Sequence, residues 1–177
     1  TDPAHPERGG VTAEQMRTEF ARQGRYMAGL ATKYRPSALT AGSDHQALAP
    51  GFEIGTRFHS APVVRVADGK HLELGHAHRA DGRWRLYAFG DETGAGLIEL
   101  AAWLSDSPHS PVRRFTPEGR HVDAVLDVHA VFQGDHHAVD LGRMPEILIP
   151  HSGPLGLQDW EKIWATDAAH DVFDARG

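Results

Sequence analysis

The chain has 177 residues, enough for one well-cored domain with an appended helix but too few for two full domains. Its 24 acidic and 18 basic side chains give a formal charge of −6, which argues against a nucleic-acid partner. No apolar run approaches the roughly 18 residues of a membrane span. Cysteine is absent, which removes disulfides and thiolate chemistry. We therefore expect a cytoplasmic protein without membrane or nucleic-acid partners.

The N-terminal part predicts a linker followed by a helix. Residues 1–10 are rich in Pro and Gly and predict a flexible linker. Thr12 and Gln15 have the spacing of a capping box, and Pro36 is expected to end the helix after Tyr34. The large side chains at helical spacing predict one apolar stripe: Met16, Phe20, Met27, Leu30 and Tyr34. Such a stripe indicates a helix that packs against another surface.

Residues 55–91 predict strand, turn, strand, turn, strand. Asp68-Gly69 lies between two apolar runs, which is a strong hairpin signal because both residue types tolerate a tight turn. The same pair recurs at 81–82, before a run in which Tyr87, Ala88 and Phe89 predict a central strand that is buried on both faces.

The rest of the chain alternates helices with strands. Residues 94–106 predict a helix, 121–135 a strand, 141–150 a short helix or extended piece, and 156–167 a further short helix. Residues 169–177 begin a new element. This order predicts an α/β or α+β domain with a mixed sheet.

Gly94-Ala95-Gly96 resembles the start of a dinucleotide-binding fingerprint. Glu99 occupies the position of its third glycine and would bring bulk and negative charge to the pyrophosphate. We therefore expect the two glycines to ease a strand-to-helix turn and to bind no cofactor.

Histidines offer two candidate metal clusters, His76 with His78 and Asp135-His136-His137. Zinc requires three or four ligands at fixed spacing, and no H-E-x-x-H or comparable signature occurs, so no bound metal is expected.

A nominal catalytic triad is the remaining candidate. Ser110, Ser152 and Asp159 can be combined with a histidine, but neither serine lies in a G-x-S-x-G elbow, so we assign no catalytic residue.

The segment "FHSAPVVRVADGKHLELGHAHRADGRWRLYAFGD" resembles the C-terminal domain of FAD-dependent aromatic hydroxylases of the phenol 2-monooxygenase and 3-hydroxybenzoate 4-monooxygenase type. The resemblance includes Pro62-Val63, Leu74-Gly75-His76 and, above all, "ADGRWR" at 80–85. Residues 24–37 resemble the closing helix of the flavin and substrate portion of that family. "GPLGLQDWEKIW" and "DVFDARG" are similar to its late segments.

This resemblance implies a thioredoxin-like fold without redox cysteines over residues 41–177, preceded at 11–40 by a helix from the flavin portion. It implies homodimer contacts in this domain, with FAD, NADPH and the phenolic substrate bound upstream. No catalytic, cofactor-binding or metal-binding residue of the family maps onto this chain. Family members continue beyond a segment like "DVFDARG", so the domain is expected to be truncated at its C-terminus.

The predicted function is therefore that of a non-catalytic structural and dimerisation domain of a flavoprotein aromatic monooxygenase. Two alternatives stay open: a stand-alone thioredoxin-like protein that binds a small aromatic ligand near Trp84, Tyr87 and Phe89, and a free-standing enzyme with a His/Asp constellation. Two surfaces are candidates for self-association: the stripe of the helix at 12–34, and the face around Trp103, Trp160 and Trp164.

Overall fold

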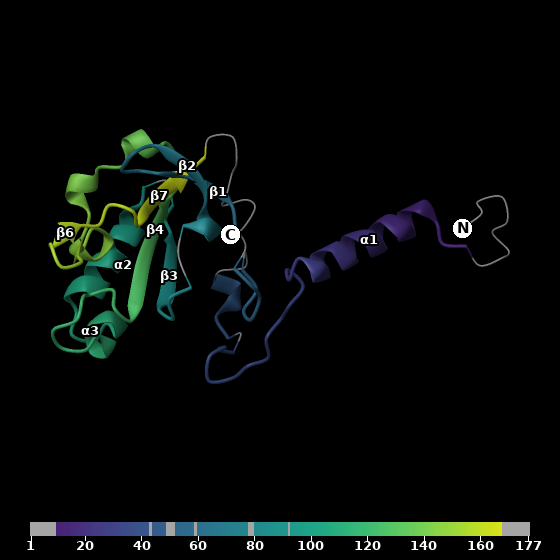
Figure 1. Ribbon diagram of the computed structural model, residues 1–177, viewed down its shortest axis with the longest axis horizontal. Coiled ribbons are helices and arrows are strands. Elements are labelled where there is room, and N and C mark those ends of the chain that lie inside the picture. Colours follow the sequence, from purple (N-terminus) through teal and green to yellow (C-terminus); the bar gives the residue numbers. More distant parts are fainter. Residues whose placement is uncertain are drawn as a thin grey trace. The chain divides into compact units, whose positions relative to one another are not determined.

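The computed structural model describes residues 10–42, 44–48, 52–58, 60–77, 80–91 and 93–167 (Figure 1). Contacts within the chain divide it into two compact units, residues 1–59 and 60–177. The division expected from the sequence, at residues 10 and 40, stays a prediction. Among the described residues, no helix is long and apolar enough to cross a bilayer.

The first unit contains helix α1, Ala13–Met27, and the 3₁₀ turn η2, Gln46–Leu48. The predicted capping box is confirmed. The Gln15 backbone N–H donates to Thr12 Oγ1 at 3.1 Å, and the Thr12 N–H donates to Gln15 Oε1 at 2.8 Å. These two bonds satisfy donors that the first turn of a helix leaves without partners.

The predicted extension of this helix to Tyr34 is wrong. Gly29 has a φ of +72°, and the Leu30 N–H bonds back to the Arg25 carbonyl at 2.9 Å, which terminates α1 in a Schellman motif. Leu30 and Tyr34 therefore do not continue the helical stripe. None of the residues of α1 is buried.

The second unit contains a five-stranded mixed sheet in its described residues. Its strands are β1 (Pro62–Arg65), β2 (Lys70–Glu73), β3 (Trp84–Phe89), β4 (Leu126–Phe132) and β7 (Ile163–Thr166), in the order β2-β1-β7-β4-β3 (Figure 1). Strands β3, β4 and β7 are parallel, and β1 is antiparallel to both of its neighbours. The hairpin predicted around Asp68-Gly69 joins β1 to β2, with Gly69 at a φ of +67°.

One face of the sheet is covered by helices and short 3₁₀ turns. Helix α2, Ala95–Asp106, and helix α3, Pro111–Phe115, follow β3, and the turn η6, Glu146–Leu148, follows β4. Three further turns, η3 (Leu74–His76), η4 (His136–Ala138) and η5 (Leu141–Arg143), and a small hairpin, β5 (His151–Ser152) with β6 (Leu157–Gln158), complete the described unit. The core of this layer consists of Leu97, Ala101, Leu104, Val112, Val128, Ala130, Phe132, Ile147, Leu148 and Ile163.

The predicted α/β fold with a mixed sheet is confirmed and is consistent with a thioredoxin-like domain, but two elements differ from prediction. Strand β3 is an edge strand of this sheet, not its centre, and Trp84 is 54% exposed. Residues 156–167 form β6 and β7 where a helix was predicted. The run Ile163-Trp164-Ala165 is fully buried between β1 and β4, and short apolar runs of this kind do not distinguish a buried strand from a helix. The element predicted at 169–177 lies outside the described residues.

Candidate functional site

The most unusual site in the second unit is a group of charged side chains on the sheet face opposite α2. Strand alternation creates it, because Val128 and Ala130 of β4 point into the helix-covered core and Asp127 and His129 point to the other face. Asp127 is only 3% exposed and Lys162, just before β7, only 2%. We call the following residues the charge cluster: Asp81, Arg83, Arg85, Asp123, Asp127 and Lys162.

Asp127 is the centre of the charge cluster. Its Oδ1 lies 2.9 Å from Lys162 Nζ, and its Oδ2 lies 3.3 Å from an Arg83 guanidinium nitrogen and 3.6 Å from Arg85 Nε. The His129 Nε2 is 3.0 Å from the same Oδ2. The buried carboxylate therefore has basic groups on both of its oxygens.

Two further carboxylates complete the balance of charge. Asp81 accepts hydrogen bonds from Arg83 Nε at 2.9 Å and from Arg85 at 2.8 Å. Asp123 Oδ2 lies 3.2 Å from Arg83 and 3.4 Å from Lys162. Three carboxylates thus face three permanent cations, which keeps a buried ionic group tolerable.

The local electrostatics hold the carboxylates of Asp127 and Asp81 in their charged form. Burial raises the pKa of Asp127, but the His129 side chain and the Lys162 charge outweigh burial, so the pKa lies well below its usual range. Hydrogen bonds from Arg83 lower the pKa of Asp81 in the same way. The charge cluster is therefore a fixed ionic anchor between the ends of β3, β4 and β7, and its central carboxylate stays ionised at neutral pH.

Aromatic rings pack beside the charge cluster on the same sheet face. The His129 ring stacks at 5.0 Å from both Tyr87 and Trp164, with interplanar angles of 16° and 18°. Burial raises the pKa of the Tyr87 hydroxyl well above its usual range. Within the described part of the chain, Trp164 Nε1 and His129 Nδ1 have no hydrogen-bond partner, so stacking and the contact of His129 Nε2 with Asp127 hold these rings.

Of the three aromatic residues predicted to line a ligand site, Trp84 is separated from Tyr87 and Phe89, which share the other face of the strand by alternation. Trp84 lies on the helix side of β3 with Leu86 and Ala88, and Tyr87 points to the opposite face, where it meets His129. Trp164 was a candidate for an exposed contact face, but it is 1% exposed. The first correction follows from strand alternation, which places neighbouring residues on opposite faces, and the second from the position of β7 between β1 and β4.

The side chain of Asp91 organises the turn between β3 and α2. Asp91 Oδ1 accepts hydrogen bonds from the backbone N–H groups of Thr93 and Gly94 at 3.0 and 2.8 Å and from the Thr93 hydroxyl at 2.7 Å. The Asp91 carboxylate thus lies in the turn just before α2, near the helix N-terminus at which a dinucleotide would place a phosphate, and the absence of a bound cofactor stays a prediction. Gly94 is required by packing, since it has a φ of +64° and a Cβ there would lie 2.6 Å from the Phe132 ring.

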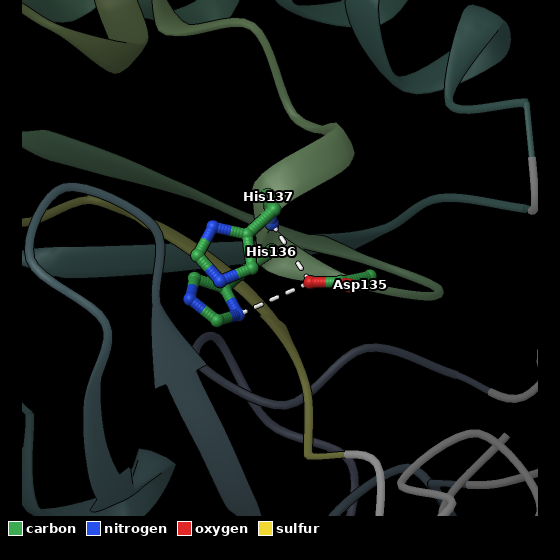
Figure 2. A group of neighbouring side chains, drawn as sticks. All are labelled: Asp135, His136 and His137. Atoms are coloured by element: carbon green, nitrogen blue, oxygen red, sulfur yellow. Dashed lines mark hydrogen bonds and ion pairs between the residues drawn. The ribbon is translucent and has the colours of Figure 1, made fainter.

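Figure 2 shows the candidate metal group Asp135, His136 and His137, whose ligand atoms lie within 4.8 Å of one another. Asp135 Oδ1 accepts the His137 backbone N–H at 2.9 Å and lies 3.3 Å from His136 Nδ1. The two rings pack against each other, with centroids 3.9 Å apart. His76 lies in the turn η3, and His78 lies outside the described residues. The absence of a bound metal stays a prediction.

The residues of the nominal triad lie in a helix cap, a short strand and a loop. The Ser110 hydroxyl is buried, donates to the Leu104 carbonyl at 2.7 Å and accepts the Arg113 N–H at 3.1 Å, so it caps α3. Ser152 lies in β5, and Asp159 Oδ1 accepts the Glu161 N–H at 2.8 Å.

Sequence reasoning missed the charge cluster as a unit. One signal was available, since Asp127 and His129 alternate with apolar residues in an otherwise apolar strand. Such alternation predicts a strand with one polar face, but the partners of those polar residues come from segments far away in the chain.

The fold and the site define a class of protein. It is an α/β domain with a mixed sheet in a thioredoxin-like arrangement, whose charge cluster is centred on the buried Asp127 carboxylate. Comparison with known proteins gives the family. Residues 32–177 match the family described as "Phenol hydroxylase, C-terminal dimerisation domain", and the chain belongs to it.

Two relatives show how this segment relates to longer proteins. The whole chain is 45% identical to 29% of a 3-hydroxybenzoate 4-monooxygenase from Comamonas testosteroni. A second relative, the FAD-dependent monooxygenase terD from Aspergillus terreus (strain NIH 2624 / FGSC A1156), is 30% identical over 85% of the chain and 25% of its own length. The chain thus spans less than a third of either relative.

Proposed function

We propose that this chain is the dimerisation domain of a longer flavoprotein, the parent enzyme, which hydroxylates a simple phenolic acid or phenol. The observation that carries the proposal is the 45% identity to a 3-hydroxybenzoate 4-monooxygenase across the whole chain. The second relative is named as FAD-dependent, which supports a flavin as the cofactor of the parent enzyme.

The chemistry in this proposal belongs to the part of the parent enzyme outside this chain. NADPH supplies two electrons, and dioxygen supplies two oxygen atoms. One of these atoms enters the aromatic ring and the other leaves as water. We propose a cytoplasmic homodimer in which this domain joins two subunits and supports the flavin portion, with no flavin, nucleotide or metal of its own. The Asp91 carboxylate in the turn before α2 supports this assignment, because its negative charge lies near the position that a phosphate would take.

Two measurements on the chain test its own role. The purified chain should be colourless, should not oxidise NADPH and should contain no stoichiometric zinc by elemental analysis. Sedimentation at several concentrations should show a dimer. A flavin or zinc at one per chain contradicts the non-catalytic assignment, and a strict monomer contradicts the dimerisation role.

The activity of the parent enzyme needs a separate experiment. The full reading frame should be expressed with and without the segment that corresponds to residues 41–177 and assayed for NADPH oxidation with 3-hydroxybenzoate and phenol. The deletion should reduce soluble yield and dimer content more than it changes turnover in the flavin-loaded protein that remains. If a folded, flavin-loaded deletion protein has lost hydroxylation itself, this segment carries a catalytic group.

A further inference from the structure

A dimerisation domain needs an exposed apolar surface that binds a second copy. Helix α1 has exposed apolar side chains, but it lies before residue 32, where the match to the dimerisation family begins. Trp164, a candidate from the sequence, is buried. We therefore place the contact surface on the second unit, which holds most of the matched residues, among its other large apolar side chains.

Helix α2 has two flanks that differ in their neighbours. Its inner face, formed by Leu97, Ala101 and Leu104, is buried against the sheet. On one flank, Ile98 lines a groove with Val139 and Met144. The segment that contains Val139 also lines a groove with Val66, which follows β1. This flank of α2 therefore faces the β1 side of the sheet.

The other flank of α2 faces the β3 edge and is apolar. Leu100 and Trp103 lie there, because helical spacing places them on the side opposite Ile98, next to the buried inner face. They are 39% and 46% exposed, respectively. Large apolar side chains that remain this exposed on a helix flank indicate an interaction surface.

Strand β3 adds a second tryptophan to this flank. Trp84 shares the helix side of the strand with Leu86 and Ala88, both of which pack on the core under α2. The chain enters α2 from the end of β3, so the helix runs back along the strand and its later turns, with Trp103, lie towards the Trp84 end. We call Trp84, Leu100 and Trp103 the edge patch.

We propose that the edge patch is the centre of the homodimer interface, where it meets the same patch of a second copy across a two-fold axis. This inference rests on the proposed dimerisation function. A two-fold interface uses one self-complementary patch on both subunits, and tryptophan is among the residues most enriched in interface hot spots. The patch lies at the edge of the sheet, where surrounding surface can extend it to the roughly 800 Å² per partner of a stable interface.

Point variants of the whole chain test the edge patch. Leu100→Glu and Trp103→Ala should each raise the dimer dissociation constant at least about tenfold in sedimentation equilibrium, as expected for hot-spot residues. Trp160→Ala is the matched control, because Trp160 is an exposed tryptophan outside the patch. It should leave the constant unchanged. Far-UV circular dichroism should show that all three variants fold like the wild type.

Single cysteines provide an independent measurement, because the chain has none of its own. Gly96 lies one turn before Leu100 on the same flank, and a Cβ there meets nothing within 4 Å. Gly24 in α1 is equally open and is the matched control. A short bis-maleimide should link two copies of Gly96→Cys and leave Gly24→Cys mostly unlinked.

The outcomes separate this inference from the proposed function. A wild-type dimer that persists in both patch variants, or that links through Gly24→Cys and not through Gly96→Cys, overturns the edge patch but leaves the dimerisation role intact. A wild-type chain that is monomeric at every concentration overturns both.

Discussion

Removing the Asp127 carboxylate should lower the free energy of unfolding of the domain more than removing a surface carboxylate does. The wild-type charge cluster sets three carboxylates against three permanent cations. In Asp127→Leu, Asp81 and Asp123 alone would face Arg83, Arg85 and Lys162, and the Lys162 ammonium, 2% exposed, would lose its nearest partner at 2.9 Å.

The magnitude follows from burial. At 2.9 Å and an effective dielectric constant of about 20, one unit pair attracts by roughly 6 kcal/mol, most of which offsets the cost of taking both charges out of water. Breaking such a pair from one side leaves a buried cation without compensation. We therefore expect Asp127→Leu to lower the free energy of unfolding by about 3–5 kcal/mol.

A double variant makes the reasoning specific. Asp127→Leu with Lys162→Met removes one charge of each sign, so that two carboxylates face two arginines. This double variant should be more stable than Asp127→Leu alone, because the uncompensated ammonium is gone. Asp68→Asn is the surface control: its carboxylate bonds Arg65 at 2.7 Å in an exposed position, and its loss should cost far less.

Urea unfolding followed by tryptophan fluorescence and far-UV circular dichroism measures these differences, provided that the urea dependence of the unfolding free energy is the same in all variants. All variants should be compared at one protein concentration, since dimerisation adds to apparent stability. A loss below about 1 kcal/mol in Asp127→Leu, or a double variant that is no more stable than Asp127→Leu, refutes the argument from uncompensated burial.

Three further outcomes can be measured with the same unfolding assay. Gly94→Ala should lower the free energy of unfolding by about 1–3 kcal/mol, because Gly94 has a φ of +64° and a Cβ there would press on the buried Phe132 ring. Gly96→Ala should leave this free energy unchanged or raise it by up to about 1 kcal/mol. Trp164→Ala should cost about 3–5 kcal/mol, and Trp84→Ala, at a half-exposed ring, less than half of that. The folded pKa of Asp127 lies below its ordinary value of 3.8, so its stabilisation is complete above that pH and is lost as the pH falls towards the folded pKa. Wild-type stability should therefore fall more steeply in acid than that of Asp127→Asn.

Local sequence signals predicted the elements whose structure depends on neighbouring residues. The capping box at Thr12 and Gln15, the hairpin at Asp68-Gly69 and the helix at 94–106 all appear as expected. Each is stabilised by bonds or turns within a few residues, so its pattern is complete in a short window. The helix end at Gly29 also depends on neighbouring residues. This glycine is a typical stop signal, and the prediction that Pro36 ends the helix did not take it into account.

Elements that depend on distant partners were not predictable in this way. Strand β7 is short, and it is buried because β1 and β4 flank it, which no window around Trp164 reveals. The same limit applies to the charge cluster. Lys162 is an ordinary lysine in sequence, and it becomes a buried counter-ion only when β7 is placed beside the strand that carries Asp127.

The charge cluster and the edge patch are connected through one strand. Trp84 lies between Arg83 and Arg85, and both arginines are held by Asp81 and Asp127 on the side of β3 away from the patch. These ion pairs help to fix the position of β3, because an edge strand has a hydrogen-bonded neighbour on only one side. Asp127→Asn should therefore raise the dimer dissociation constant even where the domain is still folded. Sedimentation of Asp127→Asn in the absence of urea measures this effect, and Asp68→Asn is the control. An Asp127→Asn chain that is folded and dimerises as tightly as the wild type would show that the cluster stabilises the domain without positioning its contact surface.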